Sequence, residues 1–110
     1  MRFFLREWPQ LRKRRAERDH GKLLRVPEIS RFLGIVIAIL YREHDPPHFH
    51  ATYGEYGITV GILDGVVSGT FPKRALRHVL EWHELHRAEL LEDWNLARQH
   101  ERLKPIPPLE

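Results

Sequence analysis

The chain has 110 residues, of which 42% are hydrophobic. It is therefore long enough for one domain with a modest core and too short for two of ordinary size. The absence of cysteine excludes a disulfide scaffold and any thiolate metal site, which leaves histidine and carboxylate as metal ligands. The longest apolar run, residues 35–41, is far below the roughly 20 residues of a membrane-spanning helix, and the N-terminus lacks a signal-type apolar segment. We therefore expect a soluble, cytoplasmic protein.

The net charge of +3 conceals a division along the chain. Residues 1–25 hold nine Lys and Arg against three Asp and Glu, a formal charge of +6, whereas residues 26–110 hold nine against twelve, a charge of −3. We treat residues 1–25 as a basic N-terminal extension, with a possible helix at about residues 9–18, and residues 26–110 as a single domain with a short Pro-rich tail. The positive charge belongs to the extension, so it says little about nucleic-acid binding by the domain.

Turn signals divide the first half of the domain into expected strands. Residues 35–41 are rich in β-branched side chains and too short for a typical helix, which predicts a strand covered on both faces. Residues 48–53 alternate in polarity. With residues 56–63 and 66–70 they predict two hairpins, one turning at Gly54 and one at Asp64-Gly65. The result is an antiparallel meander of about four strands.

The two hairpins also predict which side chains share a face. Pairing Tyr53 with Tyr56 and Leu63 with Val66 sets the register of both. One face is then apolar and is expected in the core, with Phe49, Ala51, Tyr53, Tyr56, Ile58, Val60, Ile62, Val67 and Phe71. The other is expected to be a mostly polar surface that leaves room beside its imidazoles, with His48, His50, Thr52, Gly57, Thr59, Gly61, Ser68 and Thr70.

The second half of the domain is expected to be helical from Pro72 to about Gln99. Two apolar stripes follow each other out of phase, which predicts one bent helix or a helix pair packed on one face of the sheet. Thr70 is a possible N-cap, with the proline tolerated in the first turn. Residues 104–109 contain three prolines and predict an extended tail. The predicted fold class is α+β.

The end of the segment that joins the first two expected strands, together with the start of the second strand, holds the most residues able to bind a metal or transfer a proton. His44, Asp45, His48 and His50 lie within seven residues around Pro46-Pro47, and the prolines predict a rigid bend. One interpretation is a divalent metal site, for an ion such as zinc, in which His48 and His50 are joined by Asp45 or His44. A second makes His48 or His50 a general acid or base in RNA cleavage. A third places both histidines at an interface with a partner protein or a second copy.

The RNA interpretation needs a group that holds phosphate. Lys73, Arg74 and Arg77 lie at the expected start of the helix and are the candidates for this role.

Two further sets of residues have a structural interpretation. The histidines His78, His83 and His86 lack the four-residue spacing of zinc proteases and are expected on the helix surface. Trp82 and Trp94 are expected to be core anchors, because both lie on helices that must cover the sheet.

Four blocks of the domain together resemble a known family. They are Pro27-Glu28-Ile29-Ser30-Arg31-Phe32, residues 44–51, Phe71-Pro72-Lys73-Arg74-Ala75-Leu76, and residues 81–97. The chain resembles domain of unknown function family 4160 over essentially all of residues 26–110. Members are small bacterial proteins, often encoded beside a protein of domain of unknown function family 2442, and the pair is commonly suggested to be a toxin-antitoxin module. The resemblance implies such a role, with the family 2442 protein as partner. RNA as a target and a homodimer follow instead from the second and third interpretations of His48 and His50.

The family pattern also bears on the N-terminus. Members typically begin with Met-Pro directly before the Ile-Ser-Arg-Phe-like segment, and here Val26 occupies the place of that methionine. We hypothesise that Val26 is the genuine start and that residues 1–25 are translated upstream sequence. The alternative is a true basic arm, and the intact mass of the natively expressed protein distinguishes the two.

Overall fold

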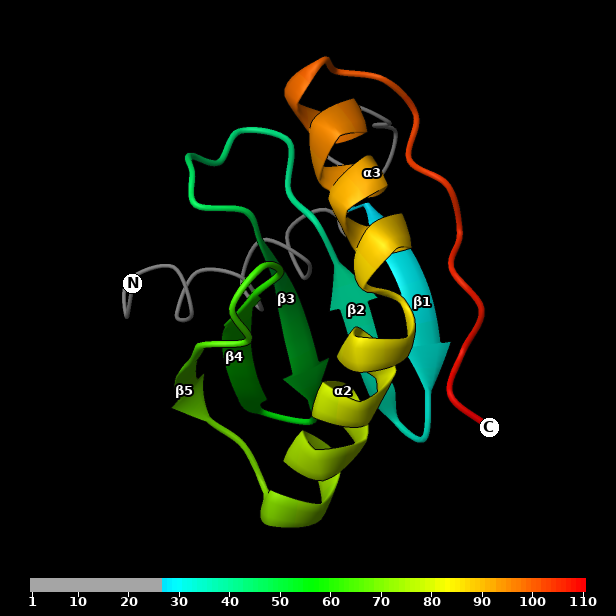
Figure 1. Cartoon of the computed structure of the whole chain (residues 1–110). Helices are drawn as coiled ribbons and strands as arrows, with labels where there is room; N and C mark the ends of the chain where they lie inside the picture. The colour runs from blue at the N-terminus through cyan, green and yellow to red at the C-terminus, as the bar shows by residue number, and fades with distance from the viewer. Residues whose placement is uncertain (1–26) are drawn as a thin grey trace, which may run out of the picture.

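Five antiparallel strands and two helices make up the part of the chain that the computed structural model describes, residues 27–110 (Figure 1). The strands lie in the order of the sequence and are β1 (Glu28–Phe32), β2 (Ile35–Ala38), β3 (His48–Tyr53), β4 (Tyr56–Gly61) and β5 (Val67–Thr70). The helices α2 (Lys73–Leu85) and α3 (Arg87–Arg98) cover one face of the sheet. The α+β meander with a helix pair is confirmed. The predictions for residues 1–25 and for Val26 lie outside the described residues.

The fifth strand, β1, was not predicted. It is joined to β2 by Leu33 and Gly34, whose φ angles are 51° and 80°. Two successive positive φ angles are typical of the type I′ turn that closes a two-residue hairpin. This turn lacks the Asn-Gly or Asp-Gly pair by which such turns are recognised. Leucine is uncommon at positive φ, so the sequence did not indicate a turn here.

The two predicted registers have different outcomes. Between β3 and β4, all six predicted pairs are confirmed. Between β4 and β5 the prediction is wrong by two residues, because Val60 pairs with Val67. The loop is longer than the predicted two-residue turn, because β4 ends at Gly61 and β5 begins at Val67. Within this loop, Asp64 Oδ1 accepts the backbone N–H of Val66 at 3.0 Å. An even shift keeps every side chain on its expected face.

The core lies between the sheet and the two helices. The predicted apolar face supplies most of its sheet side, and both predicted tryptophan anchors are at most 2% exposed. Tyr53 and Tyr56 are an exception, at 38% and 47% exposed, because they flank the turn at the end of the sheet. The largest fully buried side chains are Trp82, Phe49, Ile35, Ile37, Ile39, Ile58, Ile62, Leu90, His50, Val60 and Val79.

The break between the helices lies at His86, whose φ of −121° and ψ of 25° are not helical. The first helix begins after Pro72 without a side-chain cap, so the cap predicted at Thr70 is wrong. The surface position predicted for His83 is also wrong. Its helical phase turns it toward the sheet, where it is 2% exposed and donates from Nε2 to the carbonyl of Ile62 at 2.7 Å.

The C-terminal tail runs back along α3 and β1 (Figure 1). Three hydrogen bonds of 2.8 Å fasten it. The N–H of Ile106 donates to the carbonyl of Ile29, Trp82 Nε1 donates to the carbonyl of Pro107, and the N–H of Lys104 donates to Asp93 Oδ1. Residues 27–110 contain no helix that is long and apolar enough to cross a membrane.

Asp93 on α3 is a buried carboxylate with an incomplete set of partners. It is 1% exposed, and its Oδ2 has no hydrogen-bond partner within the described residues. Burial raises the pKa of the Asp93 carboxyl from 3.8 to about 6, and the nearby charges of Glu92 and Glu89 act in the same direction. The amide of Lys104 opposes the increase without cancelling it. The charged form is therefore the less favourable one in the folded protein.

This raised pKa predicts a fall in stability between about pH 4 and 6. In that window the folded protein keeps a proton that the unfolded chain has lost, so the free energy of unfolding decreases as the pH rises. The difference between the two pKa values corresponds to at most ~3 kcal/mol. Asp93→Asn keeps an acceptor for Lys104 but removes the charge, so it should flatten this dependence and unfold at higher urea concentration at pH 7. The matched control is Glu81→Gln, an exposed carboxylate on α2 that does not act on the pKa of Asp93. Parallel curves for wild type and Asp93→Asn would contradict the prediction.

Candidate metal centre

The link between β2 and β3 folds over the start of β3. It contains the cis peptide bond Asp45-Pro46, and the carbonyl of Pro47 accepts the N–H of Ile62, just beyond β4, at 2.9 Å. The link thus leaves β2, bends and rejoins the sheet beside β4 (Figure 1). This path brings the side chain of Glu43 over the first residues of β3.

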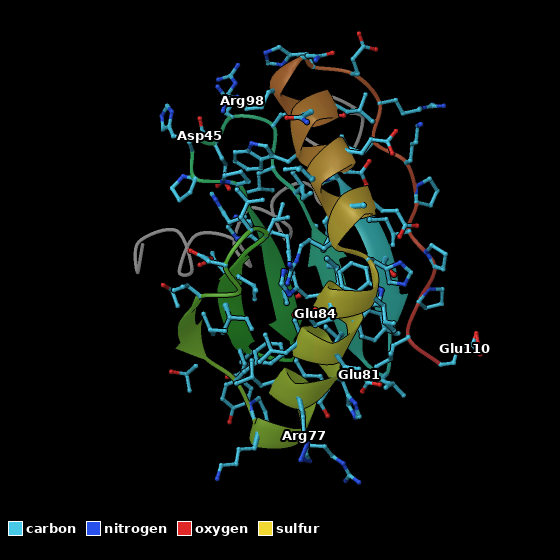
Figure 2. All side chains as sticks on the ribbon, in the orientation of Figure 1. Asp45, Arg77, Glu81, Glu84, Arg98 and Glu110 are labelled. Carbon is cyan, nitrogen blue, oxygen red and sulfur yellow. The ribbon has the colours of Figure 1, made fainter. Side chains whose placement is uncertain are left out.

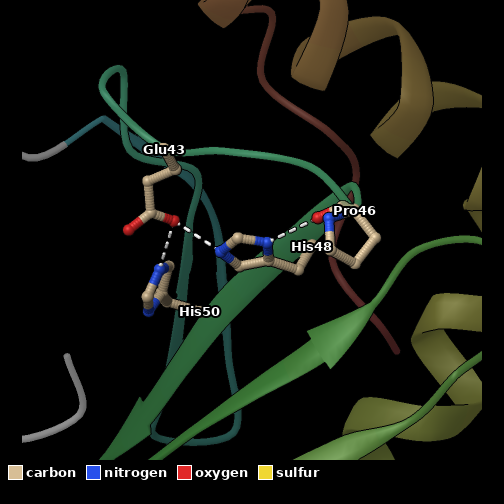
Figure 3. Close-up of polar contacts among 4 residues, drawn as sticks. All are labelled: Glu43, Pro46, His48 and His50. Atoms are coloured by element: carbon tan, nitrogen blue, oxygen red, sulfur yellow. Dashed lines mark hydrogen bonds and ion pairs between the residues drawn. The ribbon is translucent and has the colours of Figure 1, made fainter. Parts of the chain in front are cut away.

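Three side chains converge there (Figure 3). His48 and His50 lie two residues apart on β3 and therefore point to the same face. Glu43 Oε1 lies 2.6 Å from His48 Nε2 and 2.8 Å from His50 Nε2. The side chains of Glu43, His48 and His50 are 2%, 16% and 0% exposed. Their potential ligand atoms all lie within 4.8 Å of one another.

The contacts of His48 determine where its protons lie. Its Nδ1 is 2.8 Å from the carbonyl oxygen of Pro46, and a carbonyl can only accept, so Nδ1 carries a proton. Its Nε2 faces the Glu43 carboxylate, which also accepts. Burial alone would lower the pKa of His48, but its hydrogen bonds to Glu43 and Pro46 outweigh burial and raise it. The same contacts therefore favour the protonated ring of His48 beside the Glu43 carboxylate.

Glu43 is stabilised in its charged form by the same contacts. Burial alone would raise the pKa of the Glu43 carboxyl, but the hydrogen bonds from His48 and His50 and their charge outweigh burial and lower it. A carboxylate in low-dielectric surroundings needs such partners, because its desolvation is otherwise costly.

A metal ion can take the place of the shared protons. With neutral rings, His48 and His50 each offer an Nε2 lone pair, and the Nδ1–H of His48 stays on the Pro46 carbonyl, as is usual for a metal-binding histidine. Ligand atoms around tetrahedral zinc lie about 3.4 Å apart, given bonds of about 2.1 Å. The carboxylate would therefore need to retreat by roughly half an ångström. Glu43 Oε2, buried and without a hydrogen-bond partner among residues 27–110, is a second available oxygen.

Helix α3 packs against the cluster from the side. The ring of Trp94 lies 5.1 Å from that of His48, and the guanidinium of Arg98 lies 5.9 Å from the centre of the Trp94 ring. Arg98 also forms an ion pair with Asp45 at 3.1 Å, and Figure 2 shows these two at the same end of the molecule. The link and the His48 ring are thus both in contact with the last turns of α3.

A pocket of about 330 Å³ adjoins the cluster. The predicted room beside His48 is present, because Thr59, Gly61 and Ser68 all line it. A Cβ at Gly61 would displace the Asp64 carboxylate, which occupies that space. Among the three cluster residues, Glu43 and His48 reach the wall. The full lining consists of Arg42, Glu43, His44, Asp45, Pro46, His48, Thr59, Gly61, Asp64, Val66 and Ser68.

The family model described as Domain of unknown function (DUF4160) matches residues 34–95, more than half of the chain. This chain belongs to the DUF4160 family. The matched range includes the three cluster residues and Trp94. No curated protein and no solved structure matches the chain.

The DUF4160 domain brings together only part of the predicted ligand set. His48 and His50 converge, whereas His44 and Asp45 lie in the exposed part of the link and outside the cluster. The third group is Glu43, which was not predicted as a ligand. The sequence does place a carboxylate, Glu43, just before the bend. His44 and Asp45 are also potential ligands and lie nearer to the two histidines in the sequence, so they were preferred.

The polar face is also less open than predicted. His50, Thr52 and Thr59 are at most 6% exposed, so the expectation of a polar surface around His50 is wrong. The side chain of Glu43 reaches over His50 from the link. An RNA backbone therefore has no direct access to this imidazole.

The candidate phosphate-binding residues lie elsewhere. Lys73, Arg74 and Arg77 belong to the first turns of α2, near the end of β3 that is farther from His48 (Figures 1 and 2). Strand β3 alone, from His48 to Tyr53, spans about 17 Å. The structure therefore does not bring these cations into one site with His48 and His50.

The buried cluster predicts a large stability effect for Glu43→Ala. Removal of the carboxylate leaves two imidazoles without their shared acceptor, one of them fully buried, which should lower the free energy of unfolding by ~2–4 kcal/mol. Urea unfolding with a chelator present measures this without any metal. Glu55→Ala, in the exposed turn after β3, is the matched control and should change stability by less than ~0.5 kcal/mol. Equal effects of the two variants would contradict the expected cost of leaving these imidazoles without their acceptor.

Proposed function

We propose that this DUF4160 protein binds a divalent transition-metal ion, with zinc the best fit, through Glu43, His48 and His50. The observation that carries the proposal is the convergence of two ring nitrogens on one buried carboxylate oxygen. Two imidazoles and one carboxylate are a ligand set of catalytic zinc sites. Magnesium and calcium prefer all-oxygen surroundings and fit it less well.

Three protein ligands would leave a fourth position for water or a substrate. Structural zinc sites usually have four protein ligands, whereas catalytic sites keep one position open. The adjoining pocket, walled by Glu43 and His48, gives that position access from outside. We therefore propose that the metal acts as a Lewis acid on a molecule bound in the pocket.

Metal titration of single variants tests the ligand set. The full-length protein should bind one zinc ion at this site by calorimetry. Glu43→Gln, His48→Gln and His50→Gln should each weaken binding at least about tenfold, because each removes a direct ligand. His44→Gln and Asp45→Asn are the matched controls in the same link and should change affinity less than about twofold, since both lie outside the cluster.

Circular dichroism of each variant separates lost binding from lost folding. Two outcomes would contradict the proposal. One is the absence of zinc binding by folded wild-type protein, and the other is equal weakening by His44→Gln and His48→Gln.

We propose second the role that the family resemblance implies, a toxin-antitoxin component that acts on RNA with a family 2442 protein as partner. The observation in its favour is that His48 is 16% exposed and lines the pocket, so a ligand can reach it. We place this proposal second because His50 is buried and because Lys73, Arg74 and Arg77 lie far from His48. In this proposal His48 would be the acid or base.

Growth of cells that express the full chain tests the toxin role. If the protein is a toxin that acts through its histidines, expression should arrest growth, and His48→Ala/His50→Ala at equal soluble level should relieve the arrest. The triple variant Lys73→Gln/Arg74→Gln/Arg77→Gln separates the mechanisms. If these three residues contact phosphate, the triple variant should also relieve the growth arrest. If the protein acts through the metal centre, the triple variant should still arrest growth. Normal growth with wild-type protein would contradict the toxin role.

A further inference from the structure

We infer that the pocket beside Glu43 and His48 binds a small organic anion, with an oxyanion such as a carboxylate facing the metal and an apolar body against the pocket wall. This inference rests on the proposed metal site. It adds the chemical class of the ligand and names Arg42 as a residue that attracts this ligand.

The charge of the metal centre favours an anionic fourth ligand over a neutral one. A divalent ion with one carboxylate and two neutral imidazoles has a net charge of +1. The centre is almost enclosed, because the side chains of Glu43 and His50 are at most 2% exposed. A net charge in such surroundings is costly unless it is paired. An oxyanion at the open position neutralises it, and the pocket is where such a group can enter.

Arg42 supplies a second positive charge to the same pocket. It lines the wall and has no ion pair or hydrogen bond among residues 27–110. The other charged residues of the link are already engaged, Glu43 with the histidines and Asp45 with Arg98. Asp64, across the pocket, is held in its turn by the N–H of Val66. Among the described residues that line the pocket, Arg42 is therefore the cation available to attract an anion toward the metal.

The rest of the pocket suits a small apolar body. Most of the surface that its wall exposes is apolar, including the ring of Pro46 and the side chain of Val66. The volume of about 330 Å³ is at the lower end for small-molecule sites. This size favours a compact molecule over a polymer chain.

Cobalt-substituted full-length protein allows a direct test with benzoate as the probe. Benzoate should bind saturably and change the visible absorption of Co²⁺, whereas neutral benzyl alcohol should not. Ser68→Phe fills the pocket from β5 and should abolish the benzoate effect while Co²⁺ affinity stays unchanged. Arg42→Gln should weaken benzoate two- to fivefold, about the value of one exposed charge pair. Arg87→Gln, an exposed cation outside the pocket, is the matched control and should change nothing.

The metal and anion measurements fail independently. If Co²⁺ binds but benzoate leaves the spectrum unchanged, or binds Ser68→Phe as tightly as wild type, the anion site is overturned and the metal proposal stands. If folded protein does not bind Co²⁺, the metal proposal is overturned and the anion site with it.

Discussion

The shared contact of Glu43 with His48 and His50 is the interaction on which the arrangement of this end of the molecule depends. A carboxylate that is 2% exposed loses its hydration, which costs several kcal/mol unless charged or hydrogen-bonded partners replace the water. The partners here come from β3, whereas the carboxylate comes from the link. The contact therefore joins the link to a strand that is itself paired in the sheet. The conformation of a connecting segment is thus tied to strand pairing by the electrostatics of one buried group.

The other attachments of the link come from elements that follow it in the sequence. Its carbonyl at Pro47 is bound by Ile62, Asp45 is paired with Arg98, and the His48 ring lies against Trp94. The cluster therefore requires both the β3–β4 hairpin and the docking of α3. Each exposed contact is weak alone, as expected for a surface ion pair. Together they fix a side-chain geometry that the link itself does not encode.

This dependence explains which features could be predicted from the sequence. The β3–β4 register follows from local chemistry, because Gly54 adopts a φ of 60° and alternation then places every side chain. Hairpin β1–β2 was missed because a leucine occupies its turn. Glu43 was missed because its position results from contacts with residues 47–62 and α3, for which the link has no local signal. Proximity along the chain favoured His44 and Asp45 instead, and only the fold separates them from the cluster.

Two buried carboxylates in the described part of the chain show what distinguishes the candidate site from ordinary burial. Asp93 accepts one backbone N–H, has an unpaired oxygen, and has a raised pKa. Glu43 is equally enclosed, yet its pKa is lowered by two converging imidazoles. A buried ion pair seldom stabilises a fold more than apolar side chains of the same volume would, and the apolar core on the opposite face of the sheet needs no such group. The presence of a charged cluster beside a pocket is therefore better explained by binding than by stability.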